Sequence, residues 1–349
     1  MSLALSDLRA LPLARYEFRL RARRDTLLPT FLGSTLRGSF GHALKAIACS
    51  VQHRDCRRCL LAEACLYPPI FEPGALPNDS KSKQPDPPRP FIFQPPLPAV
   101  SGAALTTENS RRAWLEKHIP VTAGAQLSFG LTLFGSTAIA RLPYIVYAVE
   151  LMGQHGLGSA RTPFELEEVL VLNERNECFS IYTPQKSEPQ TTRIAPHKQE
   201  VTTLHDLIER RLLQFDIRDS LTLLFITPAW VEINGEVLKS ITCEQLFKRL
   251  SWRISRLFEL YGDAPLIYDY QNLIAKAATV RTTNEFIWMH RFTRYSNRHQ
   301  DKTPMQGFLG ELTYRGAALE ELLPIIVAGE FLQLGKETAF GLGRYLCAA

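Results

Sequence analysis

The chain has 349 residues, enough for two domains that each bury a core of their own. Hydrophobic residues make up 45% and charged residues 21%, as in an ordinary globular protein, and a net charge of +5 is too small to indicate nucleic acid by itself. No run approaches the roughly eighteen apolar residues of a membrane span, and the start lacks a signal-peptide pattern, so we expect a cytoplasmic protein with no membrane partner.

The first predicted elements are a strand and a helix. Residues 15–23 alternate between apolar and charged side chains, which predicts a strand with a mostly basic outer face. Such a face suits either solubility or RNA contact. Residues 34–49 form a predicted helix, because apolar side chains recur on one stripe. That stripe contains Leu36, Phe40, Ala43, Leu44 and Ile47.

His42 falls on the opposite side of this helix, at about 100° per residue, together with Gly38 and Lys45. The glycines at positions 38 and 41 lower helix stability and leave the flank without side chains, so that a ligand can approach. Lys45 lies one turn from His42, close enough for both to act on one phosphate. A solvated surface histidine is the alternative interpretation.

Four of the seven cysteines, Cys49, Cys56, Cys59 and Cys65, lie within seventeen residues with the spacing C-x6-C-x2-C-x5-C. An odd total argues against a disulfide framework, whereas this cluster suits a tetrahedral thiolate site for zinc, with His53 as a spare ligand. An iron–sulfur cluster and reduced free cysteines are the alternatives. We expect a metal here to be structural, since four thiolates leave no open coordination position.

Residues 68–98 hold 11 of the 23 prolines, a density that argues against a packed helix or central strand. We expect an extended excursion, disordered around residues 76–89, whose FIF and PPLP pieces are candidates to lie back on the domain. Beyond it, residues 125–134 predict a strand, 139–152 a helix and 164–172 a further strand, which completes a ferredoxin-like domain. The glycine-rich turn at 155–161 makes His155 a second candidate for RNA contact.

Residues 183–199 are the predicted boundary, giving domains 1–190 and 191–349. The second half predicts a short helix at 204–213, a strand at 221–226 and a helix at 243–260. That last helix carries a basic stripe at Arg249, Arg253 and Arg256, which is either solvated or an RNA contact. Residues 276–302 interleave aromatic and basic side chains, including Arg291 and Arg294, as RNA binding requires.

The last forty residues predict a strand at 307–314, a helix at 317–328 and a strand at 340–347, with Pro324 expected to kink or shorten the helix. Between helix and strand lies a glycine-rich loop that also contains lysine and arginine. Glycines allow close backbone approach and the cations supply countercharge, so we predict a phosphate-contacting loop. A glycine-rich hairpin with one exposed lysine is the alternative.

The tail, with GFLGELTYRG before this helix and GKETAFGLGRY after it, resembles the C-terminal signature of the RAMP-superfamily endoribonucleases that process CRISPR repeat RNA. GSTLRGSFGHALK is a second, shorter match. The resemblance implies an α+β fold of two tandem ferredoxin-like domains, a glycine-rich loop that contacts RNA, cleavage without a metal cofactor, and a catalytic histidine on the first helix, here His42. The expected reaction is attack of a ribose 2′-hydroxyl on the adjacent phosphate, with Lys45 stabilising the transition state.

Two other functions stay open on the sequence: a non-catalytic RNA-binding subunit of a CRISPR effector complex, and an iron–sulfur protein with basic docking faces. RNA and effector-complex subunits are the expected partners, for a monomer or homodimer. The residues expected to contact RNA are Arg37, Arg249, Arg253, Arg256, Arg291, Arg294, Gly335, Lys336, Gly341, Gly343 and Arg344.

Overall fold

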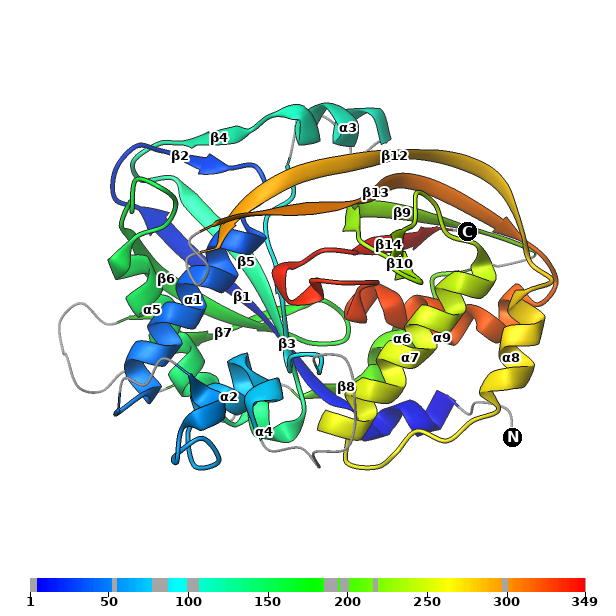
Figure 1. Cartoon of the computed structure of the whole chain (residues 1–349), viewed down its shortest axis with the longest axis horizontal. Helices are drawn as coiled ribbons and strands as arrows, with labels where there is room; N and C mark the ends of the chain where they lie inside the picture. The colour runs from blue at the N-terminus through cyan, green and yellow to red at the C-terminus, as the bar shows by residue number, and fades with distance from the viewer. Residues whose placement is uncertain are drawn as a thin grey trace.

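The computed structural model describes residues 5–51, 55–76, 87–98, 107–184, 194, 201–215, 219–296 and 301–348. Within them the chain forms two antiparallel sheets with helices packed on them, which lie side by side (Figure 1). Each sheet has the strand order of a ferredoxin-like domain. The predicted α+β class with two tandem ferredoxin-like domains is therefore confirmed.

The first sheet has the order β3-β5-β1-β6-β7. The alternation seen in the sequence is confirmed, because Tyr16, Phe18 and Leu20 are buried while the intervening side chains are partly exposed. The strands are β1 (Pro12–Ala22), β3 (Phe91–Gln94), β5 (Gln126–Phe134), β6 (Phe164–Leu172) and β7 (Cys178–Tyr182).

Two helices, α1 (Gly33–Ala48) and α5 (Leu142–His155), pack against this sheet and each other. The apolar stripe of α1 is buried as predicted, apart from Ile47, which is partly buried. The second helix begins three residues later than predicted, because a short helix, α4 (Ser136–Ile139), precedes it and Pro143 occupies its first turn.

The proline-rich region contributes more structure than predicted. Its FIF piece lies back on the domain as β3, an edge strand on β5, and all three of those side chains are buried. A short helix, α2 (Tyr67–Phe71), also forms, since its prolines occupy the first turn, where a missing N–H costs nothing. Most of the stretch predicted to be disordered lies outside the described residues, as does the predicted boundary near residue 190.

The second sheet has the order β12-β13-β9-β14. Its strands are β9 (Ser220–Ala229), β12 (Arg281–Ser296), β13 (Asp301–Arg315) and β14 (Tyr345–Ala348), and its main helices are α7 (Cys243–Tyr261) and α9 (Leu319–Leu332). Helix α9 continues past Pro324 to Leu332, so the proline does not end it. The last strand starts later than predicted because Thr338–Phe340 forms a 3-10 turn, η5, and the following glycines have positive φ.

Smaller elements connect these units. Strand β8 pairs with β1, which places the start of the second half against the first sheet, and η1 packs with α6 on the second core. The smaller elements are η1 (Leu5–Ala10), β2 (Thr26–Pro29), η2 (Cys56–Arg58), η3 (Pro73–Ala75), α3 (Thr107–Leu115), β4 (His118–Val121), β8 (Thr202–Thr203), α6 (Leu204–Leu212), β10 (Glu232–Ile233), β11 (Glu236–Val237) and α8 (Tyr270–Ala277).

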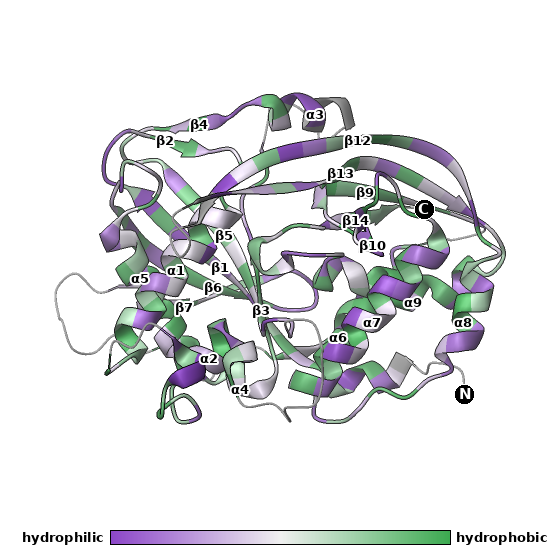
Figure 2. Ribbon diagram, viewed as in Figure 1, coloured by the Kyte–Doolittle hydropathy of each residue, from purple (hydrophilic) through white to green (hydrophobic). Residues whose placement is uncertain are grey.

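The hairpin β12–β13 extends beyond its own sheet and arches over the first domain (Figure 1). Figure 2 shows repeated changes between hydrophilic and hydrophobic residues along β12. Phe292 of this hairpin contacts Phe31 of the first domain at 5.4 Å between ring centroids. Phe31, Trp114, Met305, Leu309, Phe340 and Leu342 form a buried cluster between the domains. The junction is therefore apolar and contains side chains from both halves.

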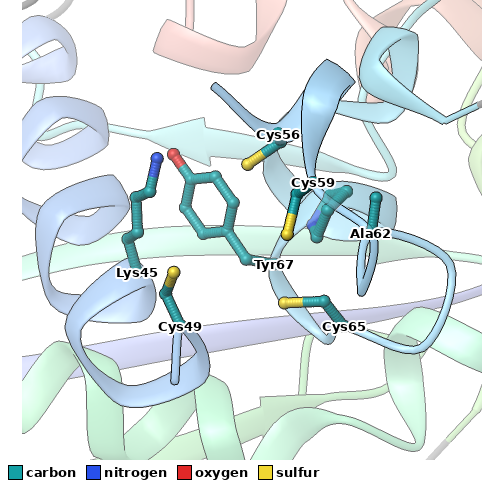
Figure 3. A pocket seen from close by; sticks show the side chains of 8 residues that line it. Lys45, Cys49, Cys56, Cys59, Ala62, Cys65 and Tyr67 are labelled. Carbon is teal, nitrogen blue, oxygen red and sulfur yellow. The ribbon is translucent and has the colours of Figure 1, made fainter. Parts of the chain in front are cut away.

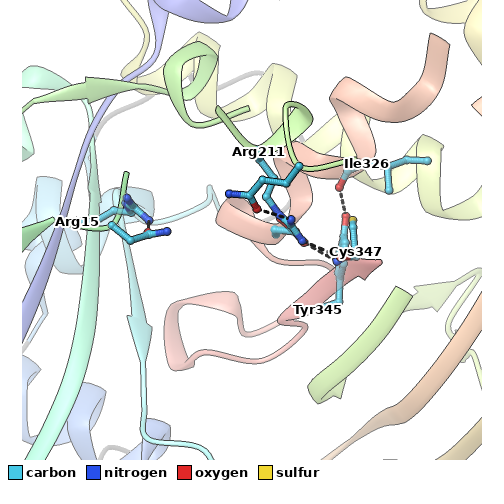
Figure 4. A network of polar contacts seen from close by, with 8 residues as sticks. Arg15, Arg211, Ile326, Tyr345 and Cys347 are labelled. Atoms are coloured by element: carbon cyan, nitrogen blue, oxygen red, sulfur yellow. Dashed lines mark hydrogen bonds and ion pairs between the residues drawn. The ribbon is translucent and has the colours of Figure 1, made fainter. Parts of the chain in front are cut away.

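A polar network holds the C-terminal strand (Figure 4). Arg211 of α6 forms an ion pair with Glu330 of α9 at 2.8 Å and donates to the carbonyl of Cys347 at 2.7 Å. Glu330 is buried, and it also accepts the peptide N–H of Cys347. Because a buried carboxylate needs partners, this network ties α6, α9 and β14 together.

Candidate nuclease site and nucleic-acid interface

His42 lies in the third turn of α1 with its side chain exposed. One turn earlier, a Cβ added at Gly38 would meet no other atom within 4 Å, so the helix surface beside His42 is open. An exposed imidazole next to an open helix flank can be approached by a large ligand. This placement agrees with the helical-wheel prediction for His42 and Gly38.

Gly41 has a different role from the one predicted. A Cβ at this position would collide with the aromatic ring of Phe71, so Gly41 is buried against α2. The glycine permits two elements to pack closely and does not open the flank for a ligand. Of Gly38 and Gly41, only Gly38 leaves the helix flank open, as predicted for both.

Lys45 lies next to His42 along the helix, but its ammonium points towards Tyr67. The Nζ atom is 5.3 Å from the centre of the Tyr67 ring, and the side chain borders a cavity that the four clustered cysteines also line. A contact between Lys45 and a phosphate at His42 therefore requires a different rotamer. Its catalytic role stays a prediction.

Arg37 lies between two aromatic rings at the domain junction. Its guanidinium carbon is 4.5 Å from the centre of Phe71 and 4.5 Å from that of Phe340. Burial lowers the pKa of Arg37 to about 9; nearby Arg89 acts in the same direction, and Glu337 opposes it. The buried Nε has no hydrogen-bond partner within the described residues. A cation with an unsatisfied donor is suited to bind an anion.

Arg294 approaches the same place from the second domain. Its guanidinium lies over the Phe340 ring, 4.9 Å from the centre, and its charge also lowers the pKa of Arg37. Arg291, on the same strand, is exposed. The structure thus brings together two of the residues predicted to contact RNA, Arg37 of α1 and Arg294 of β12, on the Phe340 ring.

The glycine-rich loop packs against protein. A Cβ at Gly341 would lie 2.7 Å from the carbonyl oxygen of Phe93, and Cβ atoms at Gly335 and Gly343 would collide with the carbonyls of Trp230 and Leu334. All three glycines have positive φ. They therefore allow tight chain crossings at the junction, and contact of this loop with a phosphate stays a prediction.

The two cations of this loop are partly engaged. Lys336 forms an ion pair with Glu232 and lies 5.8 Å from the centre of the Trp230 ring. The hydrogen bond from Lys336 lowers the pKa of Glu232. Burial lowers the pKa of Arg344, and its peptide N–H donates to Thr227 Oγ1 at 2.8 Å. Lys336 remains exposed enough to reach a ligand, whereas Arg344 is mostly covered.

The basic stripe on α7 is a correction to the sequence analysis. Arg253 is buried, and its Nε donates to the carbonyl of Leu332 at 2.6 Å, so the prediction that Arg253 contacts RNA is wrong. Arg249 donates to the carbonyl of Glu232 at 2.7 Å, and Arg256 forms an ion pair with Glu259. This helix face holds the second domain together.

The basic outer face of β1 is also neutralised. Arg19 pairs with Glu168 at 3.0 Å, and Arg21 and Arg23 pair with Glu167 and Glu165 of the neighbouring strand. Cross-strand ion pairs of this kind leave little net positive charge. The pairing favours solubility over RNA contact.

His155, the candidate in the glycine-rich turn, is the last residue of α5 and is exposed. His290 lies in the junction, 5.1 Å from Trp114 and 5.5 Å from Phe292 between ring centres, and burial lowers its pKa. His155 is therefore accessible to a ligand, whereas His290 is half-buried.

As the side chains stand, no group of three or more His, Cys, Asp or Glu residues in the described part of the chain is arranged to hold a metal ion. His53 lies outside that part. Nor does any helix of the described ranges combine the length and apolar character that crossing a bilayer requires.

The tandem ferredoxin-like domains, with a long hairpin and a glycine-rich loop at their junction, define a RAMP-type protein. A family model described as an N-terminal domain (AF_1859_N) matches residues 11–198, more than half of the chain, and the model of the CRISPR-associated endoribonuclease Cas6 matches residues 223–345. The chain therefore belongs to the family of the first model, and its C-terminal part is Cas6-like, as the resemblance of its tail implied.

Solved structures agree on the fold. Cas6 of Thermus thermophilus (TTHB231) has 15% identity and a TM-score of 0.51, with 97% of this chain and 99% of that chain covered. A partial Cas6-RT-Cas1–Cas2 complex has 10% identity and a TM-score of 0.55, with 97% of this chain covered. The present chain spans 46% of that larger relative and 29% of the chain in a second such complex. No curated protein matches the sequence.

Proposed function

We propose that this protein is a metal-independent endoribonuclease that cleaves CRISPR repeat RNA into mature guide RNAs, in the cytoplasm. The observation that carries the proposal is the exposed His42 beside the open surface at Gly38, on a helix that also bears Arg37. The match of residues 223–345 to the Cas6 model supports the reaction class. A solved relative is described as a Cas6 product complex, in keeping with RNA as the substrate.

The proposed reaction is an intramolecular transesterification. The ribose 2′-oxygen forms a bond to the adjacent phosphorus, and the bond from phosphorus to the 5′-oxygen breaks. The 2′-hydroxyl loses its proton, and the departing 5′-oxygen gains one, which yields a 2′,3′-cyclic phosphate and a 5′-hydroxyl. His42 would supply the proton to the leaving oxygen or accept one from the nucleophile, since an imidazole can serve either way near neutral pH.

Cations of the chain would stabilise the charge that develops on the phosphate. Arg37 and Arg294 stack on Phe340 from two domains, and Arg37 has an unsatisfied donor. Successive helical residues turn by about 100°, so Arg37 and His42 leave α1 in different directions. We therefore assign Arg37, Arg291 and Arg294 to flanking phosphates of the RNA, and Lys45, after rotation, to the scissile phosphate.

The proposed chemistry needs no metal cofactor, because a histidine moves the protons and lysine and arginine bear the charge. The four clustered cysteines line a cavity below the C-terminal end of α1. Any metal bound by Cys49, Cys56, Cys59 and Cys65 would therefore be structural. The complexes named for related Cas6 proteins lead us to propose CRISPR proteins as further partners.

The test is cleavage of a labelled repeat RNA in excess EDTA by the native protein and by His42→Ala. We expect native cleavage to tolerate EDTA and to leave a 2′,3′-cyclic phosphate. We expect His42→Ala to lose at least about 100-fold in rate, the usual contribution of a general acid or base, and to keep its RNA affinity. His118→Ala is the matched control, since His118 is another exposed histidine on the first domain.

Three results would contradict the proposal. Cleavage that stops in EDTA and returns with magnesium would require a metal mechanism. Equal rates for native protein and His42→Ala would place the catalytic group elsewhere. Tight RNA binding with no cleavage by the native protein would make the chain a non-catalytic RNA-binding subunit.

A further inference from the structure

The four clustered cysteines come together in space although they belong to different local elements. Cys49 caps the C-terminal end of α1, Cys56 begins the short turn η2, Cys59 caps that turn, and Cys65 precedes α2. All four line one cavity of about 20 Å³. Figure 3 shows their sulfur atoms directed towards the space between the end of α1 and the following loop.

We propose that Cys49, Cys56, Cys59 and Cys65 bind one zinc ion as a structural tetrathiolate site. Soft thiolates in a set of four are the ligands of structural zinc. The side chains as they stand are not at ligand geometry. Bonds of about 2.3 Å to zinc would draw the four sulfur atoms inward around the cavity that they already share.

The cavity of about 20 Å³ holds one water-sized sphere, so there is room for a single ion among the four sulfur atoms. The iron–sulfur alternative that the spacing left open is decided by the iron and sulfide content measured below.

The charge of Lys45 is opposite to that of the proposed zinc site. Four thiolates with one divalent cation carry a net charge of −2, and the Lys45 side chain borders the same cavity. Its ammonium lies over Tyr67, another residue of the cavity wall. In this rotamer the ammonium of Lys45 offsets part of the negative charge of the site.

The segment that carries three of these cysteines has little else to hold it. Leu60 is fully exposed and Leu61 is 47% exposed, while Cys56 and Ala62 are its buried apolar residues. Within the described residues, its backbone hydrogen bonds are those of local turns, such as Ala62 N–H to the carbonyl of Cys59 at 3.1 Å. A chain segment without a core of its own is usually held by a disulfide or a metal.

The site would also position the helix that carries His42. Cys65 leads into α2, whose Phe71 packs against Phe40 of α1 and closes over Gly41. A metal bound by Cys49 and Cys65 would join the end of α1 directly to the start of α2. The inference concerns structure, and it holds whether or not the chain cleaves RNA.

The experiment measures metal in the intact protein, purified from cells grown with both zinc and iron. We expect about one zinc ion per chain and a colourless solution. In Cys59→Ser, zinc content should fall at least about tenfold, because loss of one thiolate weakens a structural site strongly. Cys178→Ser is the matched control, since Cys178 is exposed and lies outside the cluster, and it should keep its zinc.

A second measurement covers the case in which Cys59→Ser does not fold. Zinc is released from the native protein with a thiol reagent, the thiols are restored, and cobalt is added. A visible absorption spectrum of tetrahedral thiolate-bound cobalt would support the site. Native protein that contains no zinc would overturn the proposal, as would a brown protein containing iron and sulfide. Neither readout depends on RNA cleavage.

Discussion

The surroundings of Arg37 suit an anionic ligand. Two phenylalanine rings cover the faces of its guanidinium, and its buried Nε has no hydrogen-bond partner within the described residues. Burial of such a donor is unfavourable unless an acceptor is present. The nearby Arg294 adds repulsion. An RNA phosphate in the plane of the guanidinium would satisfy the donors and relieve that repulsion.

We therefore predict that Arg37→Ala weakens RNA binding about tenfold, or about 1.4 kcal/mol. The slope of log affinity against log salt should become shallower by about 0.7, as expected for the loss of one phosphate contact on single-stranded nucleic acid. The RNA affinity of Arg37→Lys should lie between those of the native protein and Arg37→Ala, because lysine keeps the charge and loses the planar donors. The measurement is a binding titration at several salt concentrations.

Arg21→Ala is the control for this prediction, since Arg21 is exposed and paired with Glu167. It should leave both affinity and salt slope close to native values. If Arg37→Ala lowered the melting temperature but left the salt slope unchanged, Arg37 would be a structural filler of the junction and not a phosphate ligand.

At the scale of elements, Gly38 and Gly41 of α1 distinguish a glycine that leaves a surface open from one that allows close packing. Gly38→Ala should stabilise the protein by about 0.5–1 kcal/mol, because alanine is the better helix former and its methyl group meets open space. Gly41→Ala should destabilise it by about 1–3 kcal/mol, because the methyl group collides with the Phe71 ring. Urea unfolding of both variants measures the difference.

A bulky residue at the open position tests access. Gly38→Leu should fold at least as stably as native protein and should slow RNA cleavage, since the side chain would occupy the surface beside His42. Gly38→Leu with unimpaired cleavage would show that RNA approaches from another side. Equal stability of Gly38→Ala and Gly41→Ala would show that Phe71 moves away at no cost.

Periodicity predicted the long elements because burial on one face is a local property of the sequence. Residues 164–172 were assigned as a strand with the bounds that the structure gives. Strand β3 was not assigned, because four residues between prolines carry too little pattern and only the edge of β5 makes them a strand. The last strand was predicted too long, since the apolar residues from Phe340 onward fill the junction first.

The candidate site was less predictable, because the partners of a charged side chain are distant in sequence. The sequence pattern gives Arg19, Arg21 and Arg23 the same exposed, basic character, yet glutamates of β6 neutralise them. Arg253 has the spacing of a surface stripe but donates to a carbonyl 79 residues away. His42 could be placed on an exposed face from helical geometry alone, whereas Phe71 and Phe340, which hold Arg37, gave no sequence signal.

At the scale of the whole molecule, the residues that pack the two domains together lie at the same junction as two arginines that we propose bind RNA. Phe31 and Trp114 of the first domain pack against the hairpin and the glycine-rich loop of the second. Arg37 and Arg294 reach one aromatic ring from opposite domains. A ligand bound there would be sensitive to any change that loosens the packing of one domain on the other.

His290 makes that junction sensitive to acid. Burial lowers its pKa below the ordinary value of about 6.5, so the folded protein favours the neutral ring. Its contribution to stability is therefore fully present above about pH 6.5 and is lost as the pH falls, because the unfolded chain binds the proton first. We predict that native protein loses stability as the pH falls from about 6.5 to 5.5 relative to His290→Phe, which keeps an aromatic ring between Trp114 and Phe292 and cannot titrate. Urea unfolding of both proteins across this range measures the difference, in which the other seven histidines cancel. If the unfolding free energies of the two proteins changed in parallel with pH, His290 would take up its proton as readily in the folded protein as in the unfolded chain.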